Sequence, residues 1–232
     1  MQEKTAGIQC IGFIMDGNRR WAKKSGLPTL EGHKKGAEVF EDTVRFIRDE
    51  HIPHAVFYGF SSENWRRSEE EVGGLMKLFE SELEKLISKF ESDDTEKKVR
   101  FQFVGDLSKF SKKLQELMAK TEAESMEYRD TTIWVALSYG GREEILRAVN
   151  KAIVRGDEVD EEAFTGLLDT SGMPDPDIIV RTGGAQRLSN FLPWQSVYSE
   201  LLFVDRFWPD ITKEDLEGIM HRYSERTRNF GK

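Results

Sequence analysis

Short apolar runs alternate with longer segments of helical spacing along nearly the whole chain, an alternation that is typical of α/β folds. The clearest helix is predicted over residues 69–90, where apolar residues recur every three or four positions. The same kind of spacing predicts further helices over 36–50, 108–128, 142–155 and 214–228. The apolar runs predict buried strands over 8–15, 54–60, 99–104, 132–139, 178–180 and 201–204.

Strands separated by helices of this length need crossover connections, which are typical of parallel sheets. The chain has 232 residues and shows no repeat, linker or break in composition that would divide it. The sequence therefore predicts an α/β fold: a single domain over residues 1–232, with a mostly parallel sheet of about six strands flanked by helices.

The charge balance limits the partners of this chain. Its 34 Lys and Arg residues stand against 42 Asp and Glu, a formal net charge of −8. An acidic chain has no overall field that attracts nucleic acid, so we expect no nucleic-acid partner. Any anionic ligand must be held by arginines that cluster locally.

We expect a cytoplasmic protein that has at most peripheral contact with a membrane. Cys10 is the only cysteine, so no intramolecular disulfide forms and a reducing compartment fits. No apolar run approaches the roughly 20 residues that a membrane helix needs. The first residues also lack the charged-then-apolar plan of a signal peptide.

Three polar clusters each follow a predicted strand; they are 16–20, 61–67 and 181–189. Ligands of parallel sheets bind beyond the carboxyl ends of the strands. We therefore expect the three clusters to meet at one edge of the sheet and to form a site there.

The first cluster combines Asp16, Gly17 and Asn18 with two arginines, Arg19 and Arg20. Arginines and the backbone amides of a helix start suit a phosphate group. The Asp16 carboxylate would repel phosphate unless a cation lay between them, and Mg²⁺ resolves this conflict. The alternative is a strand-to-helix turn in which Asp16 caps the helix and the arginines are solvated. For an isolated Asp-Gly-Asn this alternative is the better one.

The second cluster, 61–67, offers hydroxyls, an amide and arginines. It is equally well interpreted as a capping turn before the helix at 69–90, because Ser68 and Glu71 resemble a capping box.

In the third cluster Arg181 and Arg187 flank a glycine pair and can grip a diphosphate. The alternative, a flexible loop with exposed arginines, is disfavoured by the apolar segment 191–194 that follows.

In combination and order, these clusters resemble the cis-prenyltransferase family, whose best-known members are the undecaprenyl diphosphate synthases. The resemblance runs from about residue 11 to residue 231 and rests on several strings of sequence. They are Met15-Asp16-Gly17-Asn18-Arg19-Arg20-Trp21-Ala22, Gly32-His33, Phe60-Ser61-Ser62-Glu63-Asn64-Trp65-Arg66-Arg67, Ser138-Tyr139-Gly140-Gly141-Arg142, Arg181-Thr182-Gly183-Gly184, Arg187-Leu188-Ser189-Asn190-Phe191 and Trp208-Pro209-Asp210.

The resemblance implies a homodimeric, magnesium-dependent prenyltransferase with a parallel sheet flanked by helices. It implies repeated condensation of isopentenyl diphosphate onto an allylic diphosphate, farnesyl or geranylgeranyl diphosphate. Each new double bond would be cis, and the product would be a cis-polyprenyl diphosphate of undecaprenyl length or longer. The apolar stripe of 69–90 is expected to line the channel for the growing chain as well as to pack the core.

The resemblance also implies residue roles. Asp16 is the catalytic carboxylate at magnesium. The allylic diphosphate is held by Gly17, Asn18, Arg19 and Arg20, with Trp21 and His33 beside them. The reacting ends are framed by Ser61, Ser62, Glu63, Trp65 and Arg67. Isopentenyl diphosphate is held by Arg181, Arg187, Leu188 and Ser189.

Glu200 matches a second metal-linked carboxylate that in the family can act across the dimer interface. Asn64 matches a residue to which the family often assigns proton removal; since an amide is a feeble base, it can instead orient a proton acceptor such as the departing diphosphate.

The chain departs from the family pattern at four places. Thr29 stands where many members have arginine, Ala185 where many have glutamate and Ser68 where proline is common, and the C-terminal Arg-X-Gly reads Asn229-Phe230-Gly231. These departures bear on rate and dimer geometry. The stretch 91–98 looks longer than in undecaprenyl synthases and hints at a longer product.

Two other functions compete with this one. A phosphate-transfer enzyme with Asp16 as nucleophile would want a second acid in the same loop, which offers arginines instead. A catalytically dead partner subunit would lose the Asp-Gly-Asn and Arg-Thr-Gly-Gly residues, and this chain keeps both.

Overall fold

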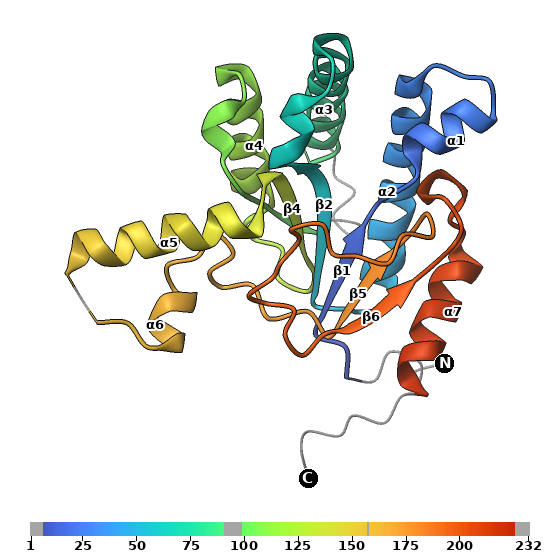
Figure 1. The fold of residues 1–232 in the computed structure, drawn as a ribbon. Coiled ribbons are helices and arrows are strands. Elements are labelled where there is room, and N and C mark those ends of the chain that lie inside the picture. Colours follow the sequence, from blue (N-terminus) through green and yellow to red (C-terminus); the bar gives the residue numbers. More distant parts are fainter. Residues whose placement is uncertain (1–6, 91–98, 157, 226–232) are drawn as a thin grey trace.

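Six parallel strands form one sheet in the order β3-β4-β2-β1-β5-β6 (Figure 1). The computed structural model describes residues 7–90, 99–156 and 158–225. The strands are β1 (Cys10–Ile14), β2 (His54–Ser61), β3 (Arg100–Val104), β4 (Thr132–Tyr139), β5 (Ile178–Arg181) and β6 (Glu200–Phe203). The prediction of an α/β fold with a parallel sheet flanked by helices is confirmed.

The helices connect these strands. They are α1 (Asn18–Lys24), α2 (Thr29–Asp49), α3 (Glu69–Phe90), α4 (Lys112–Ser125), α5 (Gly141–Arg155), α6 (Glu161–Thr165) and α7 (Lys213–Ser224), with 3₁₀ turns η1 (Ser62–Arg66), η3 (Leu107–Lys109) and η4 (Trp208–Asp210). The prediction for α3 is confirmed at both ends. Helix α2 begins at Thr29 rather than at residue 36, because its first turns are polar and glycine-rich and carry little apolar periodicity. The predicted last helix reaches residue 228, and its residues from 226 on lie outside the described part.

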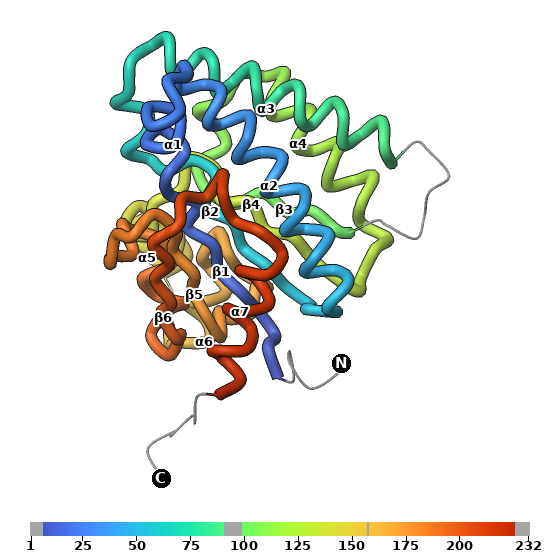
Figure 2. Tube along the Cα trace, turned by 90° about the vertical axis from the view of Figure 1, so that its right-hand side faces the viewer, coloured from blue at the N-terminus to red at the C-terminus, as the bar shows by residue number. Residues whose placement is uncertain are grey.

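The sheet is buried on both faces. On one face, Ile11 and Phe13 of β1 belong to a core cluster with residues of α2 and α7. On the other face, Cys10 and Ile14 pack with the loop residue Phe191. Helix α2 contacts α3, which contacts α4, and Figure 2 shows these three helices running side by side along the sheet. Helix α5 instead projects away from the sheet and packs on α6 (Figure 1). None of the helices in the described part of the chain is long and apolar enough to cross a membrane.

The strand order marks where a ligand can bind. Strands β1 and β5 are neighbours, and the chain leaves them in opposite directions, toward β2 and toward β6. In open parallel sheets this reversal opens a crevice at the carboxyl ends of the two strands. The crevice here lies beside Asp16 and Arg181.

Candidate active site

A cavity of about 1060 Å³ opens at the carboxyl edge of the sheet. All three clusters contribute to its polar lining, so the prediction that they meet at one edge is confirmed. At the strand ends this lining includes Asp16, Asn18, His33, Ser61, Glu63, Asn64, Arg67, Arg181, Arg187, Ser189 and Asn190, and along α2 and α3 it includes Glu41, Arg45, Arg48, Glu82 and Lys89.

The rest of the cavity is largely apolar. It continues between α2 and α3 to Phe90 at the end of α3 and to Phe101 near the start of β3. Leu75, Phe79 and Leu83 of α3 are among its lining residues. The apolar stripe of 69–90 therefore lines a channel and also packs the core, as the sequence predicts.

Asp16 lies between two arginines. Its Oδ2 is 2.8 Å from Nη2 of Arg181, and its Oδ1 is 3.0 Å from Nη2 of Arg20. Helix α1 begins at Asn18 after the Gly17 N-cap, with no side-chain capping bond, so the alternative in which Asp16 caps this helix is wrong. Gly17 has φ 124°, and a Cβ there would lie 2.8 Å from Cβ of Phe207, so only glycine fits this turn.

A second cavity of about 740 Å³ adjoins the first at Asp16 and is rich in cations. Arg19, Arg20, Lys23 and Arg67 line it together with His33. Thr29 also lines it, so the departure from the family's arginine removes a positive charge at this wall. The predicted site residue Trp21 lies outside both linings, and its indole N–H donates to Asp210 over 2.6 Å.

Glu71 contacts Arg19, Arg67 and His33 of this second cavity, a role that was not predicted from the sequence. Its Oε1 accepts from Arg67 Nη1 over 3.0 Å and lies 3.6 Å from Nε of Arg19 and 3.8 Å from Nε2 of His33. The Ser68 hydroxyl accepts from the Glu71 backbone N–H, as in a capping box, but the Glu71 carboxylate turns to the cations instead. The four-residue spacing from Arg67 is the signal that could have found this contact.

His33 is neutral in this environment. Burial lowers its pKa from 6.5 to about 4, with Arg67 and Arg19 lowering it further and Glu71 opposing them. Its Nε2 is buried and has no hydrogen-bond partner among the described residues. A neutral imidazole with a free nitrogen suits a hydrogen bond to a diphosphate oxygen.

The pKa of His33 predicts a pH dependence of stability. Between about pH 6.5 and pH 4 the unfolded chain takes up a proton at His33 that the folded protein does not, so the free energy of unfolding falls as pH falls. The loss is up to about 3 kcal/mol for a shift of this size. Urea unfolding at pH 7 and pH 4 should show a smaller loss in His33→Gln than in the wild type. Equal losses would contradict the assigned pKa.

The second cluster forms the η1 turn. The Ser61 backbone N–H donates to Oδ1 of Asn64 over 3.2 Å, so this oxygen is engaged within the turn. That engagement supports an orienting role for Asn64 rather than a role as base. Trp65 does not line the cavity: its indole N–H donates to the Ser138 hydroxyl over 2.9 Å, and its ring packs against Phe60.

Arg181 is the centre of the third cluster and is 5% exposed. Its Nη1 donates to the Ser189 hydroxyl over 2.8 Å and to the backbone oxygen of Arg187, while its Nη2 faces Asp16. The alternative of a flexible loop with exposed arginines is therefore wrong for Arg181. Arg187 is exposed and lines the cavity, whereas Leu188 packs on the apolar cluster behind it.

Glu200 lies far from Asp16 within one chain. It begins β6 and pairs with Ile178 at the start of β5, whereas Arg181, which contacts Asp16, ends β5 and pairs with Phe203. Three strand residues span roughly 10 Å, so Glu200 is at the opposite edge of the sheet. A metal role for Glu200 thus requires a second chain and stays a prediction.

Two glycines of α2 allow α1 to approach it closely. A Cβ on Gly32 would lie 2.1 Å from the carbonyl oxygen of Asn18, and one on Gly36 would lie 2.5 Å from its Oδ1. This packing places Asn18 and His33 side by side in both cavity linings. It also explains the Gly32-His33 string as a close contact between two helices.

Gly32→Ala is expected to destabilise the protein by about 1–3 kcal/mol, because the new methyl group overlaps a backbone carbonyl. Gly73→Ala in α3 is the matched control, since nothing lies within 4 Å of its added Cβ. It should stabilise by about 0.5–1 kcal/mol through helix propensity. Urea unfolding of both variants checks the prediction, and a stabilised Gly32→Ala would contradict the packing.

The donor set fits a magnesium ion that a diphosphate helps to hold. Among the described residues no group of three or more His, Cys, Asp or Glu side chains could form a metal site by itself. Mg²⁺ is commonly bound by one or two carboxylates together with substrate phosphates. Asp16 supplies a carboxylate, and the buried Oδ1 of Asn18, which has no hydrogen-bond partner there, is a second oxygen in the same cavity linings.

Comparisons with known proteins extend over nearly the whole chain. Residues 14–231 match a family model described as "Putative undecaprenyl diphosphate synthase". An isoprenyl transferase of Aquifex aeolicus is 42% identical over 223 residues, which cover 96% of this chain and 95% of the relative. A ditrans,polycis-undecaprenyl-diphosphate synthase ((2E,6E)-farnesyl-diphosphate specific) of Salmonella paratyphi A is 38% identical, covering 97% of this chain and 90% of the relative.

Two solved structures share the fold. The lavandulyl diphosphate synthase of Lavandula x intermedia, in complex with dimethylallyl diphosphate, matches with a TM-score of 0.91 and 30% identity, covering 99% of this chain and 100% of that one. A "probable undecaprenyl diphosphate synthase" of Campylobacter jejuni matches with a TM-score of 0.81 and 31% identity, covering 97% and 99%.

Proposed function

Because this chain belongs to the undecaprenyl diphosphate synthase family of prenyltransferases, we propose that it condenses isopentenyl diphosphate repeatedly onto farnesyl or geranylgeranyl diphosphate. The product would be a cis-polyprenyl diphosphate of undecaprenyl length or longer. One observation carries the proposal: the cavity joins a cationic mouth to an apolar channel that ends at Phe90 and Phe101. Such a cavity suits substrates with a diphosphate head and a growing hydrocarbon tail.

The cationic residues divide into two groups that suit two diphosphates. Arg19, Arg20 and Arg67 line the second cavity and suit the allylic diphosphate. Arg181 and Arg187 lie across Asp16 from them and suit isopentenyl diphosphate. Arg20 and Arg181 both pair with Asp16, and we expect them to exchange this carboxylate for diphosphate oxygens when the substrates bind.

Magnesium is part of the proposal. Bound by Asp16 and diphosphate oxygens, it would supply electrostatic stabilisation of the leaving group. Arg181 would add to this stabilisation, since its hydrogen bonds to Ser189 and to the Arg187 backbone oxygen hold it in place. The proposed requirement is tested by removing magnesium with a chelator; full activity without the metal would refute it.

In each condensation the allylic C–O bond breaks and its electron pair leaves with the diphosphate. A new C–C bond forms to isopentenyl diphosphate, which then loses a proton. The Asn64 oxygen is already engaged by Ser61, so we assign the proton to the departing diphosphate and give Asn64 an orienting role. The apolar walls beside the reacting carbons keep water away from the allylic cation.

Homodimerisation is also proposed, and exposed apolar side chains support it. Ile153 and Val154 of α5 are 70% and 87% exposed, and Val197 and Tyr198 before β6 are 70% and 83% exposed. β6 is an edge strand that such a contact would cover. Glu200 follows these residues at its start and would lie near a partner. Sedimentation velocity tests the dimer, and a monomer at micromolar concentration would contradict it.

An elongation assay tests the proposed function. Purified protein receives magnesium, farnesyl or geranylgeranyl diphosphate and labelled isopentenyl diphosphate, and the products are resolved by length. We expect a ladder of long products. A protein that does not elongate, with or without added partner proteins, would refute the enzyme assignment. The length of the stretch 91–98 predicts a longer product. These residues lie outside the described part of the chain, and the same assay tests the prediction.

A further inference from the structure

Asn190, beside the proposed isopentenyl diphosphate loop, is held at both side-chain polar atoms and at its backbone oxygen. Its Oδ1 accepts from the Arg142 backbone N–H over 2.9 Å, and its backbone oxygen accepts from Gly141 N–H over 2.8 Å. Its Nδ2 donates to Oε2 of Glu143 over 3.0 Å and to Oε1 of Glu63 over 3.1 Å. Asn190 has φ 67°, a left-handed conformation that needs such support. The loop is thus anchored to the start of α5 and to η1.

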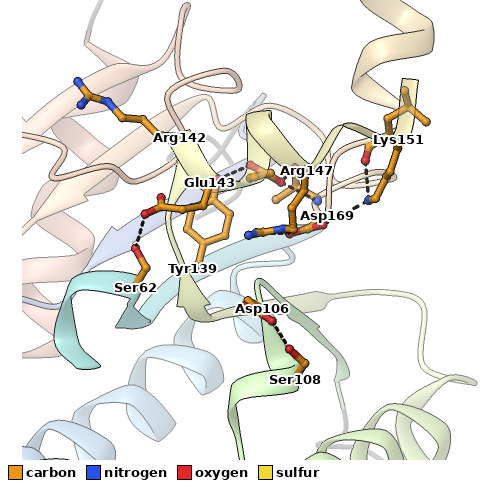
Figure 3. Close-up of polar contacts among 12 residues, drawn as sticks. Ser62, Asp106, Ser108, Tyr139, Arg142, Glu143, Arg147, Lys151 and Asp169 are labelled. Carbon is orange, nitrogen blue, oxygen red and sulfur yellow. Dashed lines mark hydrogen bonds and ion pairs between the residues drawn. The ribbon is translucent and has the colours of Figure 1, made fainter. Parts of the chain in front are cut away.

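Glu143 joins the two anchors. One of its oxygens accepts from Asn190, and the other, Oε1, accepts from the Ser62 hydroxyl over 3.1 Å. Figure 3 shows Ser62 and Glu143 pointing toward each other, while Arg142 extends away from both. Although burial opposes it, the hydrogen bonds from Asn190 and Ser62 lower the pKa of Glu143, so the bridging group is a carboxylate at neutral pH.

Gly140 provides a second, independent indication of this bridge. Its φ of −151° is open to any residue, so backbone conformation does not require glycine. A Cβ there would instead lie 2.2 Å from Oε2 of Glu143, 2.6 Å from Oγ of Ser62 and 2.8 Å from Nδ2 of Asn190. The three polar groups therefore occupy the space that any side chain at residue 140 would fill.

We propose that Glu143 is a positioning residue that fixes the loop carrying Arg187 and Ser189 against the η1 turn, and so sets the affinity for isopentenyl diphosphate. This proposal rests on the function proposed above. Glu143 lies outside the cavity lining and acts through Asn190 and Ser62. Because the allylic diphosphate is assigned to the other wall, its binding should not depend on Glu143.

Steady-state kinetics of Glu143→Ala test the assignment. We expect KM for isopentenyl diphosphate to rise about 3–10-fold, the effect of losing hydrogen bonds of ordinary strength. KM for the allylic diphosphate, kcat and Tm should stay near the wild-type values. Glu143→Gln keeps one acceptor oxygen, so its KM for isopentenyl diphosphate should lie between the values of the wild type and Glu143→Ala. Gly140→Ala should reproduce the KM effect with Glu143 still present, because its methyl group displaces the bridge.

Glu214→Ala is the matched control, since Glu214 is also an acid in the first turn of a helix but lies in α7, outside the cavity lining. An unchanged KM for isopentenyl diphosphate in Glu143→Ala would overturn the proposal. The proposal would also be overturned if Glu143→Ala raised KM for both diphosphates and lowered Tm, because that result would indicate a purely structural role.

Calorimetric binding of isopentenyl diphosphate separates this proposal from the proposed function. If the wild type does not elongate but binds isopentenyl diphosphate more tightly than Glu143→Ala does, the function fails and the positioning role stands. If the wild type elongates and the two proteins bind equally, the positioning role fails alone. A wild type that neither elongates nor binds refutes both.

Discussion

Asp16→Asn is expected to lower turnover by about 10²–10³-fold, the effect of removing one preorganised electrostatic group from an active site. The substitution keeps the size of the side chain but removes the charge that would hold magnesium and that faces Arg20 and Arg181 over 3.0 and 2.8 Å. It also leaves the nearly buried Arg181 without its anionic partner, so Tm should fall as well. Initial rates at saturating substrate and magnesium measure the effect.

Asp169→Asn is the matched control for this variant. Asp169 also binds an arginine, Arg147, through Nε and Nη2 at 3.0 and 2.5 Å, but it lies outside the cavity lining. The Asp169→Asn protein should have a lower Tm than the wild type and an unchanged turnover. An Asp16→Asn protein whose turnover stays within tenfold of the wild type would contradict the role assigned to this carboxylate.

Arg181→Lys is expected to weaken isopentenyl diphosphate binding by about 10–100-fold, since hydrogen bonds to charged groups contribute roughly 1.5–3 kcal/mol. The Arg181 guanidinium reaches Asp16 through one nitrogen and Ser189 and the Arg187 carbonyl through the other. A lysine keeps the positive charge, but its single ammonium group cannot make these contacts through two separate nitrogens. The loop would lose its attachment to β5 and the diphosphate would lose a bidentate donor.

Calorimetry with isopentenyl diphosphate measures this loss, and Arg147→Lys is its control. Arg147 makes the same kind of forked contact, with Asp169, and lies outside the cavity lining. If Arg181→Lys bound isopentenyl diphosphate as tightly as the wild type, the third cluster would not be the binding site proposed for it.

The site could be predicted from sequence where it depends on local pattern and on the geometry of parallel sheets. The bounds of α3 follow from its apolar spacing and from Ser68 before it. The meeting of Asp16 with Arg181 follows from the rule that strand ends share an edge, although 165 residues separate them. Nothing in the local pattern of Asn18–Lys24 distinguishes a helix from a turn, because α1 is short and is fixed by contact with Gly32 and Gly36.

The contacts of Glu143 and the directions of two cluster side chains depend on tertiary structure and left no signal in the local sequence. Glu143 meets Ser62 across 81 positions and Asn190 across 47, so no spacing rule could join them. Trp65 and Leu188 belong to matching strings, yet their side chains pack behind the cavity wall. Strings of matching residues therefore identify the neighbourhood of a site, while the direction of each side chain comes only from the fold.

The geometry of the new double bonds distinguishes a cis-prenyltransferase from other enzymes that elongate prenyl chains. Wild-type protein is given magnesium, farnesyl diphosphate and ¹³C-labelled isopentenyl diphosphate, and the olefinic and methyl carbons of the purified product are assigned by NMR. We expect every added unit to be cis and to carry the label. A product with trans added units, or a protein that incorporates no label, would contradict it.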